Sequence, residues 1–417
     1  MILLTIIEMF RRAVMGLVRK PDTEDNIAVF AFVAVVLFIL SRVSAGWVES
    51  AWLVFLLRWL WLPLSLAFLV LRYGEGFKRW RFRWFFRREK FVGYDGKPPT
   101  LAHSALRGLH LESVLFWSKI PFHEWEKIIP TLEIFSNKRI YKVEKTKKVQ
   151  LMNVLFVRND LPELISWSDS YTPDGRRFAV GEGYEGQVIW DAETMPHGLI
   201  AGATGSGKTG LLRCIIHQAI QKNFSVSVLD FKGGGDFVLL EDVKNSTVIS
   251  EPEAARDELL FLLAEVRDRM AAFKAAGVSN VDEYNALGRE QFEPWLLVVD
   301  EAAEVLDVKA KGDDKELYTE IDQTLRTLAR LSRAARVHLL MGVIRPSHEV
   351  LDGQIKNNLL WRVCGYFPDS PASRIVLDND KATTLPPKMK GRFIVGDEPM
   401  QAYYLDTPRR TDPPCES

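Results

Sequence analysis

A glycine-rich loop between an apolar run and a helix-forming run constrains this chain more than any other feature. Residues 202–209 fit the pattern G-x-x-x-x-G-K-S/T, which cradles nucleotide phosphates. The run 198–201 before the loop has the composition of a buried strand, and residues 210–220 after it are compatible with a helix. The helix dipole then points its positive end at the phosphates. The alternative, a glycine-rich turn that matches by chance, leaves the flanking strand and helix unexplained.

Each part of this loop has an expected role in binding ATP. Its glycines let the backbone curl so that successive N–H groups point at one anion. Lys208 is expected to reach the β- and γ-phosphates, and the Thr209 hydroxyl to ligate Mg²⁺. The predicted nucleotide-binding residues are Gly202, Ala203, Thr204, Gly205, Ser206, Gly207, Lys208, Thr209 and Gly210.

Strand and helix patterns alternate from residue 181 onward. Short apolar runs alternate with longer runs of helical period, the longest of which are 253–273 and 316–336. Such alternation predicts an α/β fold with a parallel sheet whose ligands bind at the carboxyl ends of the strands.

Two acids end one of these apolar runs. Asp300 and Glu301 follow the predicted strand that begins at Trp295. Beside a phosphate loop, Asp300 would hold Mg²⁺, and Glu301 would orient and deprotonate the attacking water. The alternative is a pair of surface acids at a strand end. Lys208, Asp300 and Glu301 are therefore predicted as catalytic residues of an ATPase.

Two apolar stretches near the amino terminus predict a transmembrane helical hairpin. Residues 27–43 and 51–71 approach the length that spans a bilayer, and the basic segment 72–90 follows them. The link 44–50 has no Lys or Arg, which predicts that both ends and the motor domain are cytoplasmic, in a protein of the cell membrane. The alternative is a pair of buried core helices. Residues 77–88 interleave aromatic and basic side chains, which favours binding to anionic lipid headgroups over binding to DNA.

The predicted domains are a membrane region 1–99, a small α+β domain 100–180 and a motor domain 181–417. Lys plus Arg and Asp plus Glu each number 54, but the first 99 residues are net basic and the remainder is net acidic. A net-acidic motor excludes general attraction to nucleic acid, so any contact with DNA must come from local basic loops. The three cysteines show no CxxC spacing, which argues against a zinc site.

Several short motifs make residues 175–405 resemble the FtsK/SpoIIIE family of DNA-pumping ATPases. The most specific is Met195-Pro196-His197, which leads into the phosphate loop. The other matching segments are 230–232 (Asp-Phe-Lys), 284–285 (Tyr-Asn), 300–304, 332–339, 345–347 (Arg-Pro-Ser), 355–358 and 373–378.

The resemblance implies a RecA-like motor domain that forms a homo-hexamer around double-stranded DNA and binds it without regard to sequence. Arg333 matches the arginine finger that completes a neighbouring subunit's site, with Arg330 and Arg336 as rivals and ion pairing as its alternative role. Arg345 and Lys356 match positions that contact DNA in the pore.

Three departures from the family pattern bear on function. Ile344 replaces a glutamine that would sense the γ-phosphate, and Ser370 replaces a pore lysine. No winged-helix segment follows the motor before Ser417. The short hairpin, the small middle domain and the motor without a winged-helix segment resemble the conjugative coupling-protein branch, whose partners include a relaxase and channel proteins. The alternatives are a chromosome-segregation motor, a protein-secretion ATPase and an ATP-binding scaffold that recruits a relaxase.

Overall fold

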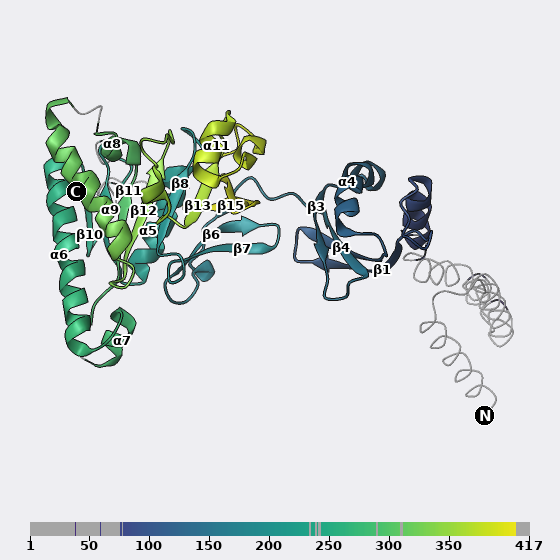
Figure 1. Cartoon of the computed structure of the whole chain (residues 1–417), viewed down its shortest axis with the longest axis horizontal. Coiled ribbons are helices and arrows are strands. Elements are labelled where there is room, and N and C mark those ends of the chain that lie inside the picture. The colour runs from purple at the N-terminus through teal and green to yellow at the C-terminus, as the bar shows by residue number, and fades with distance from the viewer. Residues whose placement is uncertain are drawn as a thin grey trace, which may run out of the picture. The chain divides into compact units, whose positions relative to one another are not determined.

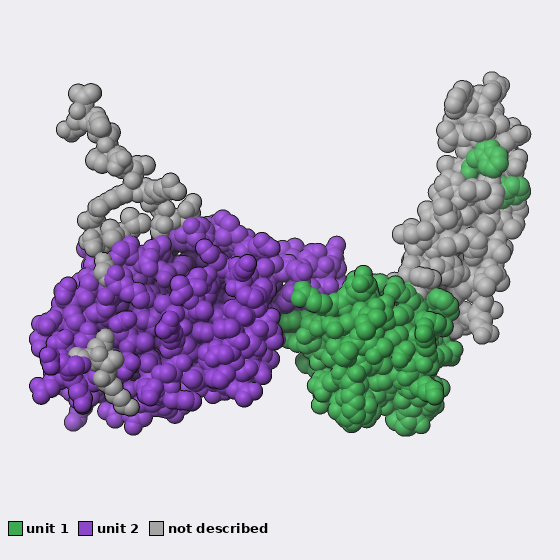
Figure 2. Space-filling view, turned by 90° about the horizontal axis from the view of Figure 1, so that it is seen from above, with its two compact units in different colours: residues 1–105, 113–156 green, residues 106–112, 157–417 purple. Residues whose placement is uncertain are grey.

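The computed structural model describes residues 38, 59, 76, 78–232, 235–237, 240, 243–288, 291–308 and 312–405. The chain forms two compact units, one of residues 1–105 and 113–156 and the other of residues 106–112 and 157–417 (Figure 2). Apart from two residues, the predicted membrane helices 27–43 and 51–71 lie outside the described residues. Within the described ranges, no helix has both the length and the apolar character needed to span a bilayer.

The smaller unit is a four-stranded sheet with strand order β1-β2-β4-β3. Its elements are β1 (Thr100–Arg107), β2 (Leu111–Trp117), α4 (Phe122–Ser136), β3 (Ile140–Lys145) and β4 (Leu151–Val157). Residues 78–88 are helical as well, and the core contains Phe82, Phe85 and Phe86 from this segment. The aromatic residues of the basic segment therefore divide. Phe82, Phe85 and Phe86 fill the core, whereas Trp80 and Trp84 stay exposed.

The larger unit contains an 11-stranded sheet with strand order β10-β9-β11-β12-β8-β13-β14-β15-β6-β7, and β5 pairs with β15 (Figure 1). In this spatial order the strands from β10 to β13 are parallel, as the sequence predicts. Beyond β13, the strands β14, β15, β6 and β7 add an antiparallel extension, and β5 pairs in parallel with β15. The strands are β5 (Ile165–Ser166), β6 (Arg177–Gly183), β7 (Gly186–Asp191), β8 (His197–Ala201), β9 (Ser225–Leu229), β10 (Ser246–Ile249), β11 (Trp295–Val299), β12 (Val337–Val343), β13 (Trp361–Gly365), β14 (Arg392–Val395) and β15 (Glu398–Tyr404).

Helices cover both faces of this sheet, so its central strands are apolar on both sides. Within β8, Leu199 belongs to the core shared with α6 and α9, and Ile200 belongs to the core shared with α5. The helices are α5 (Lys208–Gln221), α6 (Pro252–Ala276), α7 (Val281–Ala286), α8 (Ala302–Leu306), α9 (Lys315–Leu331), α10 (Gly353–Lys356) and α11 (Ser370–Leu377). The 3₁₀ turns are Asp169–Tyr171, Gly312–Asp314 and Lys381–Thr384.

Two predicted boundaries differ from those of the structure. The predicted division after residue 180 falls inside β6, whereas the compact units divide after Phe156. The reason is that β6 pairs with β15 from the far end of the chain, a contact that local sequence does not reveal. The predicted helix 316–336 ends at Leu331, and residues 332–336 form a turn.

Candidate nucleotide site

The phosphate loop joins β8 to α5 in a conformation that requires glycine. Gly205 and Gly207 have φ of +84° and +99°, in the left-handed region that side chains disfavour. A Cβ at Gly202 would lie 2.5 Å from Ser206 Oγ, and one at Gly207 would lie 2.7 Å from the main-chain nitrogen of Gly391. That nitrogen donates a 2.7 Å hydrogen bond to the Ser206 carbonyl. The main chain at Gly391 therefore supports the loop without a bound nucleotide.

Lys208, the first residue of α5, is buried against Asp300. Its ammonium donates to Asp300 Oδ1 at 2.7 Å and to the main-chain carbonyl of the same residue. Gly342 on β12 leaves room for this contact, since a Cβ there would lie 2.8 Å from Lys208 Nζ. Both side chains are nearly inaccessible, at 5% and 3% exposure, so the pair is desolvated as well as charged.

Glu301 is fixed by the residue at which the family glutamine is missing. Both of its carboxylate oxygens accept from the main-chain N–H of Ile344, at 3.1 and 3.0 Å. Burial raises the pKa of Glu301, and the Ile344 N–H, Lys208 and Lys232 oppose that shift. A buried carboxylate with a raised pKa is a better proton acceptor than an exposed one. The Ile344 backbone therefore orients the predicted general base, although its side chain cannot form hydrogen bonds.

Lys232 belongs to this site, and the sequence analysis used it only as part of a family motif. Its ammonium lies 3.3 Å from Asp300 Oδ2 and 3.7 Å from Glu301 Oε2. The residue follows β9, which pairs in parallel with β11 so that Leu229 lies opposite Val299. Lys232 is a basic residue just beyond a strand, and that strand lies next to the one that carries the acids. This signal could have identified Lys232 from the sequence.

These residues fit ATP with Mg²⁺. The loop supplies main-chain N–H groups, and the Ser206 hydroxyl is buried without a hydrogen-bond partner in the described part of the chain. Lys208 would bind the phosphates, whereas the Thr209 hydroxyl and the Asp300 carboxylate are oxygen ligands of the kind Mg²⁺ prefers. Thr209 follows Lys208 in α5 and is half-buried, and Asp300 is 2% exposed.

Arg333 is exposed on the turn between α9 and β12, where its carbonyl accepts a 3.3 Å hydrogen bond from Arg336 N. Its guanidinium has no ion pair or hydrogen bond among the described residues. β12 spans seven residues and ends beside the phosphate loop, so Arg333 is roughly 20 Å from its own nucleotide site. Its side chain therefore does not reach the nucleotide site of its own chain.

Hydrogen bonds hold this turn rigidly from several elements. Val281 N donates to the Ala334 carbonyl at 3.1 Å, and Trp295 N donates to the Arg336 carbonyl at 2.9 Å. The buried guanidinium of Arg269 donates to the Ala335 carbonyl at 2.9 Å.

The predicted rivals of Arg333 fare differently. Arg330 lies in the last turn of α9 and is exposed. Arg336 lies in the turn rather than on the helix, with φ of +56°, and forms an ion pair with Asp282. That pairing leaves Arg330 and Arg333 as the two exposed candidates.

The two predicted DNA contacts are also unlike each other. Arg345 is exposed on the loop after β12, next to Ile344, and has no ion pair among the described residues. Lys356 is half-buried and its ammonium lies 2.7 Å from Asp378 Oδ1, so it would have to leave that carboxylate to bind a phosphate. Ser370, the position of the missing pore lysine, begins α11.

The family histidines join the starts of two strands. Leu339 N donates to Nδ1 of His197 at 3.0 Å, and His338 Nδ1 lies 3.0 Å from the Pro196 carbonyl. Burial lowers the pKa of His197 to about 3 and that of His338 to about 4, so both are neutral. Their place is at the amino ends of β8 and β12, opposite the nucleotide, and their role is therefore structural.

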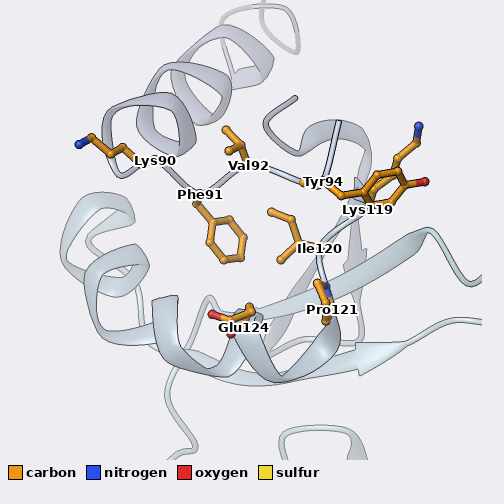
Figure 3. A pocket seen from close by; sticks show the side chains of 9 residues that line it. Lys90, Phe91, Val92, Tyr94, Lys119, Ile120, Pro121 and Glu124 are labelled. Carbon is orange, nitrogen blue, oxygen red and sulfur yellow. The ribbon is translucent and has the colours of Figure 1, made fainter. Parts of the chain in front are cut away.

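A cavity of about 310 Å³ in the smaller unit lacks comparable chemistry (Figure 3). The apolar side chains of Phe91 and Ile120 face it, while those of Lys90 and Lys119 point away (Figure 3). The Glu124 carboxylate at its margin is paired with Lys127. The nucleotide site is thus the functional site that the described residues support best.

A phosphate loop follows the central parallel strand β8, and two acids follow β11, which is separated from β8 by β12 alone. This arrangement defines a P-loop ATPase. The family model that matches this chain is described as the FtsK/SpoIIIE family, and it covers residues 172–348. The chain belongs to the FtsK/SpoIIIE family.

Relatives of known name agree with this assignment. The DNA translocase FtsK of Oceanobacillus iheyensis is 27% identical over 253 residues, which is 53% of this chain and 31% of that protein. The DNA translocase SftA of Bacillus subtilis is 32% identical over 205 residues, or 46% of this chain and 20% of that protein. This chain therefore spans a third or less of the length of these relatives.

A solved structure matches a larger share. The pCW3 conjugation coupling protein TcpA, in its monomer form with ATPγS, is 35% identical with a TM-score of 0.59. The match covers 79% of this chain and 95% of that one. The similarity thus extends beyond the residues shared with the FtsK-type relatives.

Proposed function

We propose that this protein is a membrane-anchored motor that hydrolyses ATP to move double-stranded DNA in conjugative transfer. The observation that carries the proposal is the nucleotide site in a chain whose match covers 95% of the solved chain of a conjugation coupling protein. A homo-hexamer that encloses DNA, and contacts with a relaxase and channel proteins, are parts of the same proposal.

The chain's own residues account for hydrolysis as follows. Bound Mg²⁺ and ATP supply the phosphoryl group and neutralise its charge. Lys208 leaves the Asp300 carboxylate for the phosphates, which frees Asp300 to act as a metal ligand. Glu301, held by the Ile344 N–H, takes the proton of the attacking water. Arg333 of a neighbouring subunit stabilises the charge on the transferred group.

Arg345 and Lys356 are the proposed contacts with DNA phosphates. Arg345 follows Ile344 directly, and the Ile344 N–H is bound to the Glu301 carboxylate. A shift of that carboxylate during hydrolysis would therefore move the main chain next to the proposed DNA contact. Contacts of this kind are independent of sequence and weaken as salt rises.

ATP turnover by the full chain, with and without duplex DNA, tests the proposal. We expect duplex DNA to stimulate turnover, and we expect Lys208→Ala to reduce it at least about 100-fold. Arg345→Ala should reduce the stimulation without changing turnover in the absence of DNA. Stimulation by a secretion substrate and not by DNA would instead support the protein-secretion ATPase. Nucleotide binding without turnover would support the scaffold.

Residues 27–43 and 51–71 are the proposed membrane anchor, with the motor in the cytoplasm. A cysteine placed in the link, such as Ser44→Cys in a Cys415→Ser background, should react with an impermeant maleimide from outside the cell. The two described cysteines, Cys214 and Cys364, are buried and serve as the internal control. Labelling that requires a broken membrane would contradict this topology.

A further inference from the structure

Lys232 has the more exposed of the two side chains whose ammonium groups contact the acid pair. Its side chain is 41% exposed, whereas that of Lys208 is 5% exposed. The main chain of Lys232 is fixed, because its N–H donates a 3.0 Å hydrogen bond to Oδ1 of the buried Asp230. The main chain of Lys232 is thus held just beyond β9, while its side chain is partly open to solvent.

The charges around Lys232 change when nucleotide binds. Without nucleotide, the ammonium lies between the carboxylates of Asp300 and Glu301, and these carboxylates and Asp230 raise its pKa against the effect of burial. A metal ion on Asp300 would repel this ammonium. The γ-phosphate, next to the water that Glu301 activates, then offers the nearest new anionic partner.

Ile344 cannot make the side-chain contact with the γ-phosphate that the family glutamine would make, so another residue must supply it. Its side chain has no polar atom, and its N–H is already bound to both oxygens of Glu301. Lys208 and Lys232 are the cations whose contacts with Asp300 or Glu301 appear in the described chain. Lys208 is assigned to the β- and γ-phosphates, so Lys232 remains for the far side of the γ-phosphate.

We propose that Lys232 binds the γ-phosphate and makes this site distinguish ATP from ADP, in place of the missing glutamine at position 344. The proposal rests on ATP being the nucleotide that the site hydrolyses, and it does not depend on DNA. It assigns Lys232 two partners in turn: the Asp300–Glu301 pair in the empty site and the γ-phosphate in the loaded site.

Binding of fluorescent ATPγS and ADP to the full chain, with Mg²⁺ present, tests this role. Lys232→Met keeps the length of the side chain and removes its charge. We expect it to weaken ATPγS binding at least about tenfold and to leave ADP binding within about twofold, because the lost bond is charge-assisted. Lys232→Arg should retain most of the preference. Lys274→Met, on the exposed side of α6, is the matched control.

A second variant separates a γ-phosphate contact from a general effect on the fold. Ile344→Gln in the Lys232→Met background should restore part of the preference for ATPγS, since it returns a side-chain donor to the site. Equal losses for ATPγS and ADP, or no loss for either, would overturn the proposal. The unmodified protein could prefer ATPγS to ADP, and lose that preference in Lys232→Met, without any stimulation of turnover by DNA. That result would uphold the role of Lys232 and reject the proposed DNA motor.

Discussion

At the carboxyl ends of the parallel strands, the charged groups of the nucleotide site are bound to one another. Lys208 and Lys232 contact Asp300, and the Ile344 N–H holds Glu301. At the amino ends of the same strands, Arg333 extends from a rigid turn and its guanidinium has no partner among the described residues. At the first edge the ionic partners lie within the chain, whereas at the second edge the guanidinium is exposed to solvent. One sheet thus carries the nucleotide site at one edge and Arg333 at the opposite edge.

Arg333→Ala gives the largest effect that this comparison predicts. We expect ATP turnover to fall about 1,000-fold or more, because an arginine finger contributes that much to phosphoryl transfer. Folding stability should not change, since the side chain is exposed. Steady-state turnover and the thermal midpoint are the measurements.

Mixing two inactive variants tests whether Arg333 acts on a neighbouring subunit. Lys208→Ala chains keep Arg333, so adding them to Arg333→Ala chains should restore part of the turnover. Arg330→Ala is the control and should remain active. The assignment is wrong if Arg330→Ala, and not Arg333→Ala, abolishes turnover.

Glu301→Gln probes the opposite edge. It keeps the shape of the side chain and an oxygen for the Ile344 N–H, and it removes the proton acceptor. Turnover should fall about 100-fold while ATPγS still binds, in line with the contribution of a positioned general base. Glu304→Gln, one turn further along, should have little effect on turnover. A Glu301→Gln variant with normal turnover would show that another group activates the water.

Asp282 tests whether the rigidity of the turn matters. Its carboxylate forms ion pairs with Arg336 and with Arg176, the latter at 3.1 Å. Asp282→Asn should lower turnover about tenfold by loosening the turn that presents Arg333, with unchanged nucleotide affinity. In the Arg333→Ala background the same change should have no further effect, whereas a merely structural role would add to it. Asp257→Asn breaks an exposed ion pair on α6 and serves as the control.

The two edges should also respond to pH with opposite signs. His197 and His338 have folded-state pKa values of about 3 and about 4, below the ordinary 6.5, so the unfolded chain binds more protons in between. Stability should therefore fall as pH drops below 6.5, by up to about 1.4 kcal/mol per pH unit for each histidine. Urea unfolding between pH 7.5 and pH 5 measures this loss.

Glu301 changes the folding stability with pH in the opposite direction to the histidines, and this is the smallest of the predicted effects. Its folded-state pKa is raised above 4.5, so the folded protein binds more protons than the unfolded chain just above that pH. Its contribution to stability is therefore lost as pH rises through that window. In Glu301→Gln this loss disappears, and stability should rise more steeply between pH 5 and pH 7.5 than in the unmodified protein. Parallel curves would show that Glu301 ionises as freely in the folded state as in the unfolded chain.

Much of the nucleotide site could be predicted because its signals are local. The phosphate loop is contiguous, and it precedes its own helix in the chain. Asp300 and Glu301 stand directly after an apolar strand, and a parallel sheet brings strand ends together. The family motifs then predicted the ATPase, and the comparisons confirmed the family. The membrane hairpin and the roles of Arg333, Arg345 and Lys356 stay predictions.

Other features depend on which strands become neighbours. Lys232 enters the site because β9 pairs with β11, and Gly342 makes room for Lys208 because β12 pairs with both β11 and β8. The division of the chain after Phe156 depends on β15 pairing with β6.

The sequence by itself determined that a nucleotide is bound and which loop binds it, because a glycine-rich turn between a strand and a helix is encoded within a few residues. The tertiary structure alone decided that Lys232 contacts the acids, that Ile344 acts through its backbone, and that Arg333 stands on a turn apart from its own site. These outcomes rest on hydrogen bonds between residues far apart in the chain, and strand register sets those bonds.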